Sequence, residues 1–173
     1  MKRILGYLSM VHDGLTFSAA VLASIGLISI VTFYVYEVVT RYFFNAPTAW
    51  VSDFVSYALA ASVFLALPKV TKDKGHVAVT ILVDVAPEKF ANYVHTIISL
   101  IGFGCLGLAA HISLQENIRQ FTKNIETLAI IPIPQWWVSS FITFGLAMSA
   151  LYMLRHAKLA LRDKDNSFSE ITG

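Results

Sequence analysis

Charged side chains are scarce in this sequence. They make up 14% of the 173 residues, whereas 56% are hydrophobic. A soluble globular domain carries about 25% charged residues, and a small domain leaves a large share of its surface exposed to water. A soluble chain of this length could not bury so much apolar surface. The composition therefore predicts an integral membrane protein in which lipid covers that surface.

The sequence also lacks the groups that catalysis and metal binding need. Its single cysteine, Cys105, can neither form an intrachain disulfide nor complete a thiolate metal site alone, so we interpret it as a small buried hydrophobic residue. No nucleophile–base pair, phosphate-binding loop or cluster with metal-ligand spacing occurs. We therefore expect no catalytic residue, no metal and no cofactor. The net charge of +2, without a basic run interleaved with aromatics, is untypical of a nucleic-acid partner.

What the sequence has instead is four long apolar segments. At about 1.5 Å per helical residue, crossing the roughly 30 Å hydrocarbon core takes about 20 residues. The first segment, Gly14–Tyr36, has 23 positions without a charge. The pattern predicts an all-α membrane domain over residues 1–161, and its helices are expected at about 14–40, 50–71, 88–115 and 134–156. Pro68 is expected to bend or end the last turn of the second helix.

Two shorter segments are predicted to lie in the membrane interface. Lys2–Val11 has apolar residues at helical spacing and leads into the first span. Val77–Ala86 is apolar but covers only about 15 Å as a helix. Its apolar residues alternate like a strand, yet an unpaired strand edge is disallowed in lipid, so we favour a short interfacial helix. The tail, residues 162–173, is polar and is expected to be disordered.

The distribution of basic residues predicts the orientation. With four spans, the two termini and the loop between the second and third spans share one side of the membrane. Ten of the thirteen basic residues fall on that side: Lys2, Arg3, Lys69, Lys72, Lys74, Lys89, Arg155, Lys158, Arg162 and Lys164. Because basic residues are enriched in cytoplasmic loops, both termini are predicted to be cytoplasmic. Trp50, Trp136 and Trp137 fall on the opposite side and indicate an interfacial belt.

The densest polar cluster near the lipid follows the first span. Glu37 and Arg41 are one helical turn apart, so both charges can approach the membrane together. Trp50 and Asp53 follow across a short link, and Asp53 offers Arg41 a second carboxylate. The cluster could fix this hairpin or bind a partner. Alternatively, these are boundary residues facing headgroups and water, where such ion pairs contribute little.

The middles of the spans lack Asp, Glu, Lys and Arg, so an ion or proton relay within this chain is not expected. His95 and His111 lie on one predicted helix, about 24 Å apart along its axis, and cannot bind the same haem.

Small residues predict close helix packing in three places. These are Ala20 with Ser24, Gly104 with Gly107, and Gly145 with Ser149.

Several of these features together resemble the small membrane subunit of tripartite ATP-independent periplasmic (TRAP) transporters, the DctQ-like family. The first span closes with Glu37-x3-Arg41-Tyr42, and the second opens with Trp50-x2-Asp53. Lys74-Gly75-His76-Val77 precedes the alternating apolar segment, and the fourth span starts with prolines and tryptophans. The resemblance covers nearly the whole chain, although the family more often has glutamate where Asp53 stands.

The resemblance implies a scaffold subunit in a bacterial or archaeal inner membrane. A much larger polytopic subunit would hold the substrate and sodium sites and move as an elevator, while a periplasmic binding protein would deliver an organic acid or similar carboxylate. We further expect Glu37, Arg41, Trp50 and Asp53 to shape the outer hairpin and contact a partner. Gly75 and His76 would turn the chain into the interfacial helix.

Two other functions stay open from the sequence. The first is a small proton-coupled exporter that acts as a homodimer, with Glu37 as the coupling acid; it requires Glu37 to lie in a cavity. The second is a haem-bearing membrane anchor of a redox complex, against which the placement of the histidines argues.

Overall fold

The structure is a computed structural model that describes residues 2–73 and 88–171, and four helices account for most of these residues. They are α1 (Lys2–Phe43), α2 (Val51–Lys72), α4 (Glu88–Thr122) and α5 (Gln135–Ile171). Each contains a stretch long and apolar enough to cross a membrane: Ser9–Phe43, Val51–Lys72, Thr96–Thr122 and Gln135–Lys158. The predicted all-α architecture with four candidate spans is therefore confirmed.

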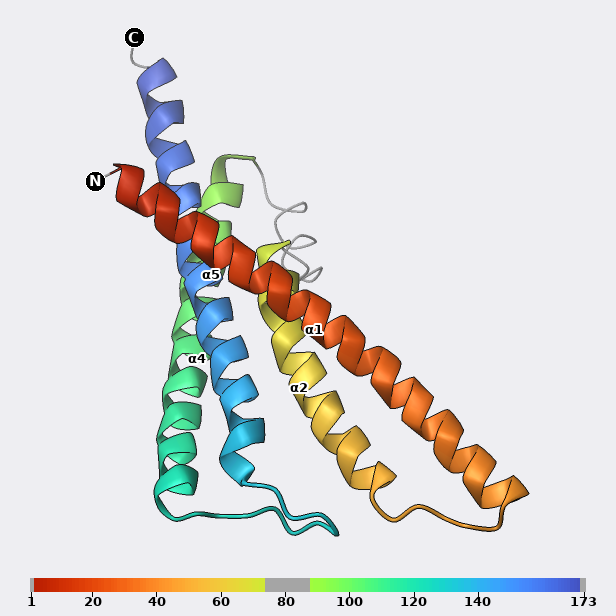
Figure 1. Ribbon diagram of the computed structural model, residues 1–173. Coiled ribbons are helices and arrows are strands. Elements are labelled where there is room, and N and C mark those ends of the chain that lie inside the picture. The colour runs from red at the N-terminus through yellow and green to blue at the C-terminus, as the bar shows by residue number, and fades with distance from the viewer. Residues whose placement is uncertain (1, 74–87, 172–173) are drawn as a thin grey trace.

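Both chain termini lie at one end of the bundle (Figure 1), which we call the termini end. The two connections that the structure describes, residues 44–50 and 123–134, lie at the other end, which we call the loop end. The predicted interfacial helix at 77–86, together with Gly75 and His76, lies outside the described residues.

Three helices are longer than the sequence pattern predicts. No break separates Lys2–Val11 from the first span, because α1 is continuous to Phe43; its place in the membrane interface stays a prediction. The α4 helix runs to Thr122 rather than to residue 115. The α5 helix continues to Ile171, so the prediction of a disordered tail from Arg162 is wrong. No proline or glycine between residues 146 and 172 interrupts its hydrogen bonding.

Asparagine ends two of the helices. Asn45 and Asn124 have φ of 50° and 47°, and asparagine tolerates this left-handed conformation better than most residues. After α1, the N–H groups of Phe44 and Ala46 both bond to the Thr40 carbonyl. These caps satisfy backbone groups that would otherwise be orphaned, and they turn the chain toward the next helix.

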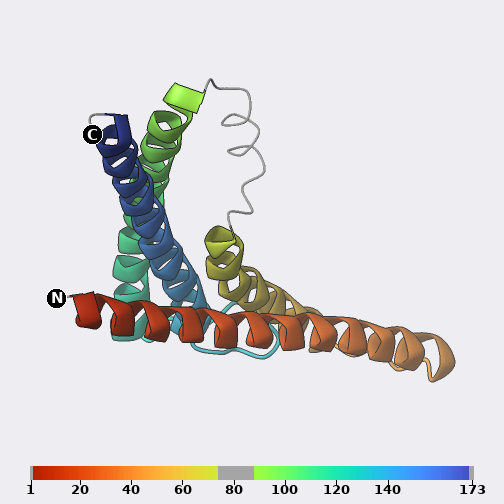
Figure 2. The same ribbon diagram turned by 90° about the horizontal axis from the view of Figure 1, so that it is seen from above.

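The α2 helix lies between α1 and α5, while α4 packs along α5. The buried core shared by three helices consists of Ala19 and Ala23 on α1, Leu65 on α2, and the partly buried Ala66 and Phe144 around them. Figures 1 and 2 show α1 crossing the bundle obliquely, with its far half leaning away from α4 and α5 beside the start of α2.

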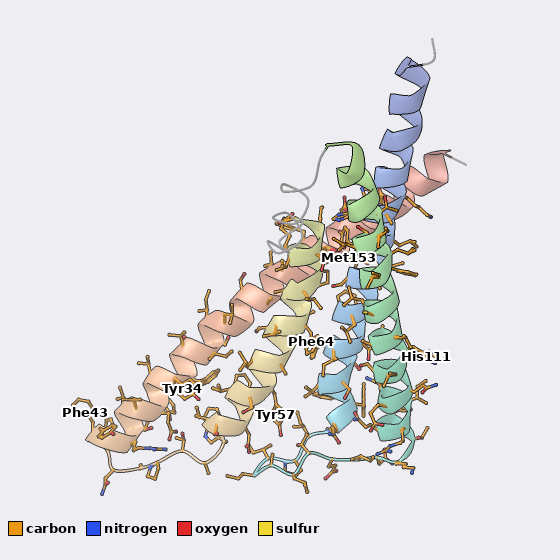
Figure 3. All side chains as sticks on the ribbon, turned by 180° about the vertical axis from the view of Figure 1, so that it is seen from behind. Tyr34, Phe43, Tyr57, Phe64, His111 and Met153 are labelled. Atoms are coloured by element: carbon orange, nitrogen blue, oxygen red, sulfur yellow. The ribbon has the colours of Figure 1, made fainter. Side chains whose placement is uncertain are left out.

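Pro68 sits inside α2 instead of ending it. A proline has no N–H, so it cannot donate a hydrogen bond to the Phe64 carbonyl one turn earlier. That carbonyl oxygen lies only 2.1 Å from where a Cβ on Gly145 of α5 would be. The missing side chain of Gly145 therefore lets α5 approach the carbonyl that Pro68 leaves unpaired within the helix. Figure 3 shows Phe64 halfway along α2.

The predicted packing at Gly145 and Ser149 is confirmed, since Ser149 is fully buried. Gly26 of α1 likewise lets α2 pack closely, because a Cβ added there would lie 2.2 Å from Ser62 Oγ of α2. The prediction for Gly104 and Gly107 is wrong within this chain, because an added Cβ there meets no described atom within 4 Å.

Hydrogen bonds between polar side chains join α4 to α5. Ser139 Oγ donates to Gln120 Oε1 over 2.6 Å, and Asn117 Nδ2 donates to Ser140 Oγ over 3.0 Å. One turn deeper, the Ser113 and Thr143 hydroxyls are 2.8 Å apart. Such bonds contribute to helix association where lipid cannot compete for them.

Cys105 on α4 is exposed, so the prediction that it is buried is wrong for the chain alone.

Candidate functional site

The ion pair predicted at the loop end is present. Arg41 Nη2 donates to Glu37 Oε1 one turn earlier on α1. The side chain of Glu37 is only 9% exposed, whereas that of Arg41 is 57% exposed. The buried carboxylate therefore holds a guanidinium whose other N–H donors remain at the surface. Glu37 Oε2 is buried and has no partner among the described residues.

Trp50 fastens the start of α2 to the end of α1. Its ring meets Phe33 edge to face, with centroids 5.6 Å apart, and Tyr36 at 6.4 Å. Phe33 also meets Phe54 at 4.7 Å. Edge-to-face pairs of this kind contribute about 0.5–1.5 kcal/mol beyond area burial. The aromatic cluster thus fixes the angle of the hairpin that carries Arg41.

Asp53 joins the two loops of the loop end. Its Oδ2 accepts a hydrogen bond of 2.9 Å from the backbone N–H of Ile130. One turn later, the Tyr57 hydroxyl donates to Thr127 Oγ1 over 2.8 Å. The contact expected between Asp53 and Arg41 does not appear among the described ion pairs, since Arg41 uses Glu37. Asp53 instead anchors the loop between α4 and α5. Figure 3 shows Tyr57 on α2 at the loop end.

The loop between α4 and α5 is a narrow hairpin. Glu126 and Pro134 form an isolated antiparallel bridge, and Thr127 exchanges hydrogen bonds with Ile133. Its tip exposes apolar side chains: Leu128 fully, Ile130 to 67% and Ile131 to 50%. The bonds from Asp53 and Tyr57 therefore hold this loop at the start of α2, with the apolar side chains of its tip exposed.

The two neighbouring tryptophans start α5 at the same end. Trp136 meets Phe121 of α4 edge to face at 5.4 Å, and its carbonyl accepts a hydrogen bond from Asn117. Trp137 meets Trp136 at 6.0 Å and is 53% exposed. Trp136 thus fastens α4 to α5, while Trp137 faces the surroundings.

A second polar cluster, which the sequence reasoning missed, lies at the termini end and joins three helices. Asp13 on α1 accepts hydrogen bonds from the Tyr152 hydroxyl over 2.8 Å and from Arg155 over 3.0 Å, both on α5. Lys72 Nζ on α2 lies 3.4 Å from the same carboxylate. The Tyr152 hydroxyl also lies 3.0 Å from Thr16 Oγ1. Asp13 therefore connects the two ends of the chain to α2.

His12 extends this cluster. Its ring stacks on Tyr152 with centroids 4.1 Å apart. The sequence signal was weak, because His12 and Asp13 directly precede the first uncharged stretch and read as boundary residues. The available signal was an aspartate, Asp13, at the edge of the first span and a tyrosine, Tyr152, inside the fourth.

Among the described residues, no group of three or more His, Cys, Asp or Glu side chains is placed to hold a metal ion. His111 contacts Gln115 on its own helix and is exposed, and Figure 3 shows it pointing away from α5. The polar groups therefore connect helices and loops to one another.

Comparison with known proteins identifies the family. The sequence model described as "Tripartite ATP-independent periplasmic transporters, DctQ component" matches residues 28–163, which cover most of the chain, including Glu37, Arg41, Trp50 and Asp53. A search of curated proteins finds no match. The matched range leaves out His12 and Asp13, so the family assignment rests on the rest of the bundle. The chain belongs to the DctQ family, the small membrane component of TRAP transporters, and is a multi-pass transporter component rather than an enzyme.

Proposed function

We propose that this chain is the fixed scaffold of a sodium-coupled TRAP transporter that imports an organic acid or similar carboxylate. Its partners are a large elevator-type subunit, which carries the substrate and sodium sites, and a periplasmic binding protein. The observation that carries this proposal is the distribution of charge in a DctQ chain. No ionisable Asp, Glu, Lys or Arg lies between Asp13 and Glu37 on α1 or between Asp53 and Lys69 on α2.

The same holds for the other two helices. On α4 no such residue lies between Lys89 and Glu116, and on α5 none lies before Arg155. Coupled transport needs ionisable or polar groups at mid-depth to bind the ion and the substrate anion. This chain has no Asp, Glu, Lys or Arg at that depth, and polar side chains there such as Ser113 and Thr143 bond to each other, so the substrate and ion sites belong to a partner.

The membrane orientation belongs to the same proposal. Ten of the thirteen basic residues belong to the two terminal segments and to the loop between the second and third spans, which favours a cytoplasmic location for both termini in the inner membrane. The loop end then faces the periplasm, and Trp50, Trp136 and Trp137 form its interfacial belt. On that side, the apolar tip around Leu128 and Ile130 is available to the large subunit or the binding protein.

Arg41 is the residue we expect to contact a partner directly. Glu37 takes one of its donors and fixes the guanidinium, while more than half of the side chain stays exposed. A fixed, exposed guanidinium suits a carboxylate or backbone carbonyls of another chain. Trp50 and Asp53 support it by holding the hairpin and the neighbouring loop.

Single Arg41→Ala and Trp50→Ala variants test this role. Each should lower both solute uptake by cells that depend on this transporter and the yield of the purified complex by at least twofold. Lys123→Ala is the matched control, because Lys123 is an exposed cation at the same end. Unchanged uptake and yield in both variants would remove the proposed contact.

The two alternatives receive no support from the family. An exporter coupled through Glu37 would need this carboxylate to exchange protons with water in a cavity, whereas Glu37 is buried against Arg41. A haem anchor would need histidines from two helices at matching depth. The described His111 instead faces outward beside Gln115.

A further inference from the structure

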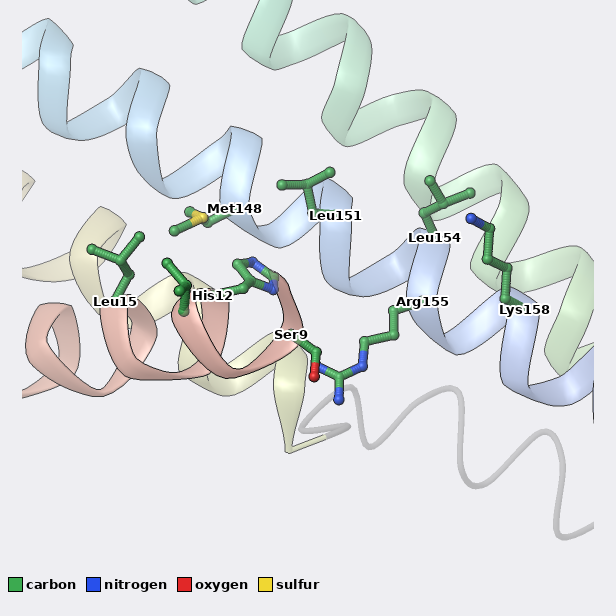
Figure 4. Close-up of a pocket in the computed structure, with 9 residues that line it drawn as sticks. Ser9, His12, Leu15, Met148, Leu151, Leu154, Arg155 and Lys158 are labelled. Atoms are coloured by element: carbon green, nitrogen blue, oxygen red, sulfur yellow. The ribbon is translucent and has the colours of Figure 1, made fainter. Parts of the chain in front are cut away.

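An open groove runs between α1 and α5 at the termini end, with a volume of about 480 Å³. Apolar side chains line its floor and walls: Val11 and Leu15 from α1, and Met148, Leu151 and Leu154 from α5. Figure 4 shows these two helices forming the two sides of the groove. A volume of this size is typical of small-molecule sites.

The groove is apolar along most of its length but basic at one end. Arg155 and Lys158 line that end and are one turn apart on α5 (Figure 4). Asp13 is shared by Arg155 and Lys72, so one carboxylate faces two cations. Lys158 adds a third positive charge and is exposed. The end of the groove therefore carries more positive than negative charge among the described side chains.

The groove thus combines an apolar channel with a cationic rim at the end of a span. An occupant that matches both parts needs an anionic head and an apolar tail. A free phosphate would leave the apolar lining uncovered, and a neutral lipid would leave the surplus cations unpaired. Basic pockets between transmembrane helices, close to the cytoplasmic surface, are suited to anionic headgroups.

We propose that this groove binds an anionic phospholipid, with an acyl chain against Leu15 and Leu151 and the phosphate at the basic end that Arg155 and Lys158 line. The lipid then lies against the helix crossing that Asp13, Tyr152 and His12 hold together. It adds to the attachment of α1, whose far half leans away from the bundle (Figure 1). This inference concerns the chain and the membrane and does not depend on the identity of the solute.

Native mass spectrometry of the chain, in whatever assembly mild detergent extracts, tests the proposal. The sample is supplied with phosphatidylglycerol or phosphatidylcholine of the same acyl composition. The wild type should retain at least five times more phosphatidylglycerol than phosphatidylcholine. Lys158→Gln should lower retained phosphatidylglycerol at least threefold, and Leu151→Trp, which fills the groove from a half-exposed position, should lower the retention of both lipids.

Matched controls are Lys123→Gln, a cation at the loop end, and Leu108→Trp, an exposed leucine on α4. Both should retain lipid as the wild type does. Equal retention of the two lipids by the wild type would overturn the proposal, whether the groove is empty or covered by a partner helix. Wild-type retention by both Lys158→Gln and Leu151→Trp would overturn it as well.

Discussion

The Tyr152 hydroxyl on α5 donates a hydrogen bond of 2.8 Å to the Asp13 carboxylate on α1. These residues belong to the last and first helices of the chain, and α1 otherwise leans away from α4 and α5 (Figure 1). Lys72 of α2 reaches the same carboxylate. One aspartate therefore connects the three helices that meet at the termini end.

Removal of this hydrogen bond should loosen the attachment of α1. Tyr152→Phe keeps the ring stack on His12 but loses the donor to Asp13, at a cost of about 1–3 kcal/mol in the free energy of unfolding. Asp13→Asn should cost at least as much, since Lys72 and Arg155 also lose their anion. Unfolding in a denaturing detergent titration measures both values.

The double variant identifies the contact itself. If the two side chains act through one hydrogen bond, Asp13→Asn with Tyr152→Phe should cost less than the sum of the single variants, with a coupling of about 0.5–3 kcal/mol. Tyr34→Phe is the control, because Tyr34 is an exposed tyrosine on α1, the helix that carries Asp13. Strict additivity would show that Asp13 and Tyr152 stabilise the bundle separately.

A methyl group at Gly145 should disturb the packing of α5 on α2. The added Cβ would lie 2.1 Å from the Phe64 carbonyl oxygen, which is backbone and cannot rotate away. We expect Gly145→Ala to cost about 1–3 kcal/mol and to lower the melting temperature in detergent. Gly107→Ala, where an added Cβ meets no described atom, should melt like the wild type. Equal melting temperatures for the two variants would contradict this packing.

The Asp53 carboxylate accepts a hydrogen bond from the Ile130 amide and should therefore slow hydrogen exchange at that amide. Loss of a charged hydrogen bond worth about 1.5 kcal/mol corresponds to roughly tenfold faster exchange in Asp53→Ala. Asp53→Asn keeps a carbonyl acceptor and should show a smaller increase. Glu126→Gln, in the same loop, serves as the control. The hydrogen bond is refuted if Ile130 exchanges at the wild-type rate in Asp53→Ala.

Reporter fusions test the orientation. Alkaline phosphatase is active only when exported, so fusions after Thr48 and Glu126, both at the loop end, should be active. Fusions after Asp73 and Asp163 should be inactive, because basic residues keep that side in the cytoplasm. The reverse pattern of activity would contradict the proposed topology.

Features that depend on neighbouring residues could be predicted from the sequence. Glu37 and Arg41 pair as expected because four residues make one helical turn. The four candidate spans followed from the spacing of charges, since a charge inside lipid is costly.

Features that depend on distant contacts could not be predicted. Asp13 and Tyr152 are 139 residues apart, and nothing in their local sequence pairs them. Asp53 was expected to face Arg41, but the loop between α4 and α5 folds back and offers Ile130 instead. Pro68 was expected to bend or end its turn, whereas α2 continues to Lys72, and α5 approaches the carbonyl of Phe64 at Gly145.

The proposed scaffold role requires that this chain bind a larger membrane subunit. Purification of the chain from its native membranes in mild detergent, followed by mass identification of what accompanies it, tests that claim most directly. The account predicts a stable complex with one much larger polytopic membrane subunit. Recovery of the chain alone, or as a homodimer that itself transports, would contradict it.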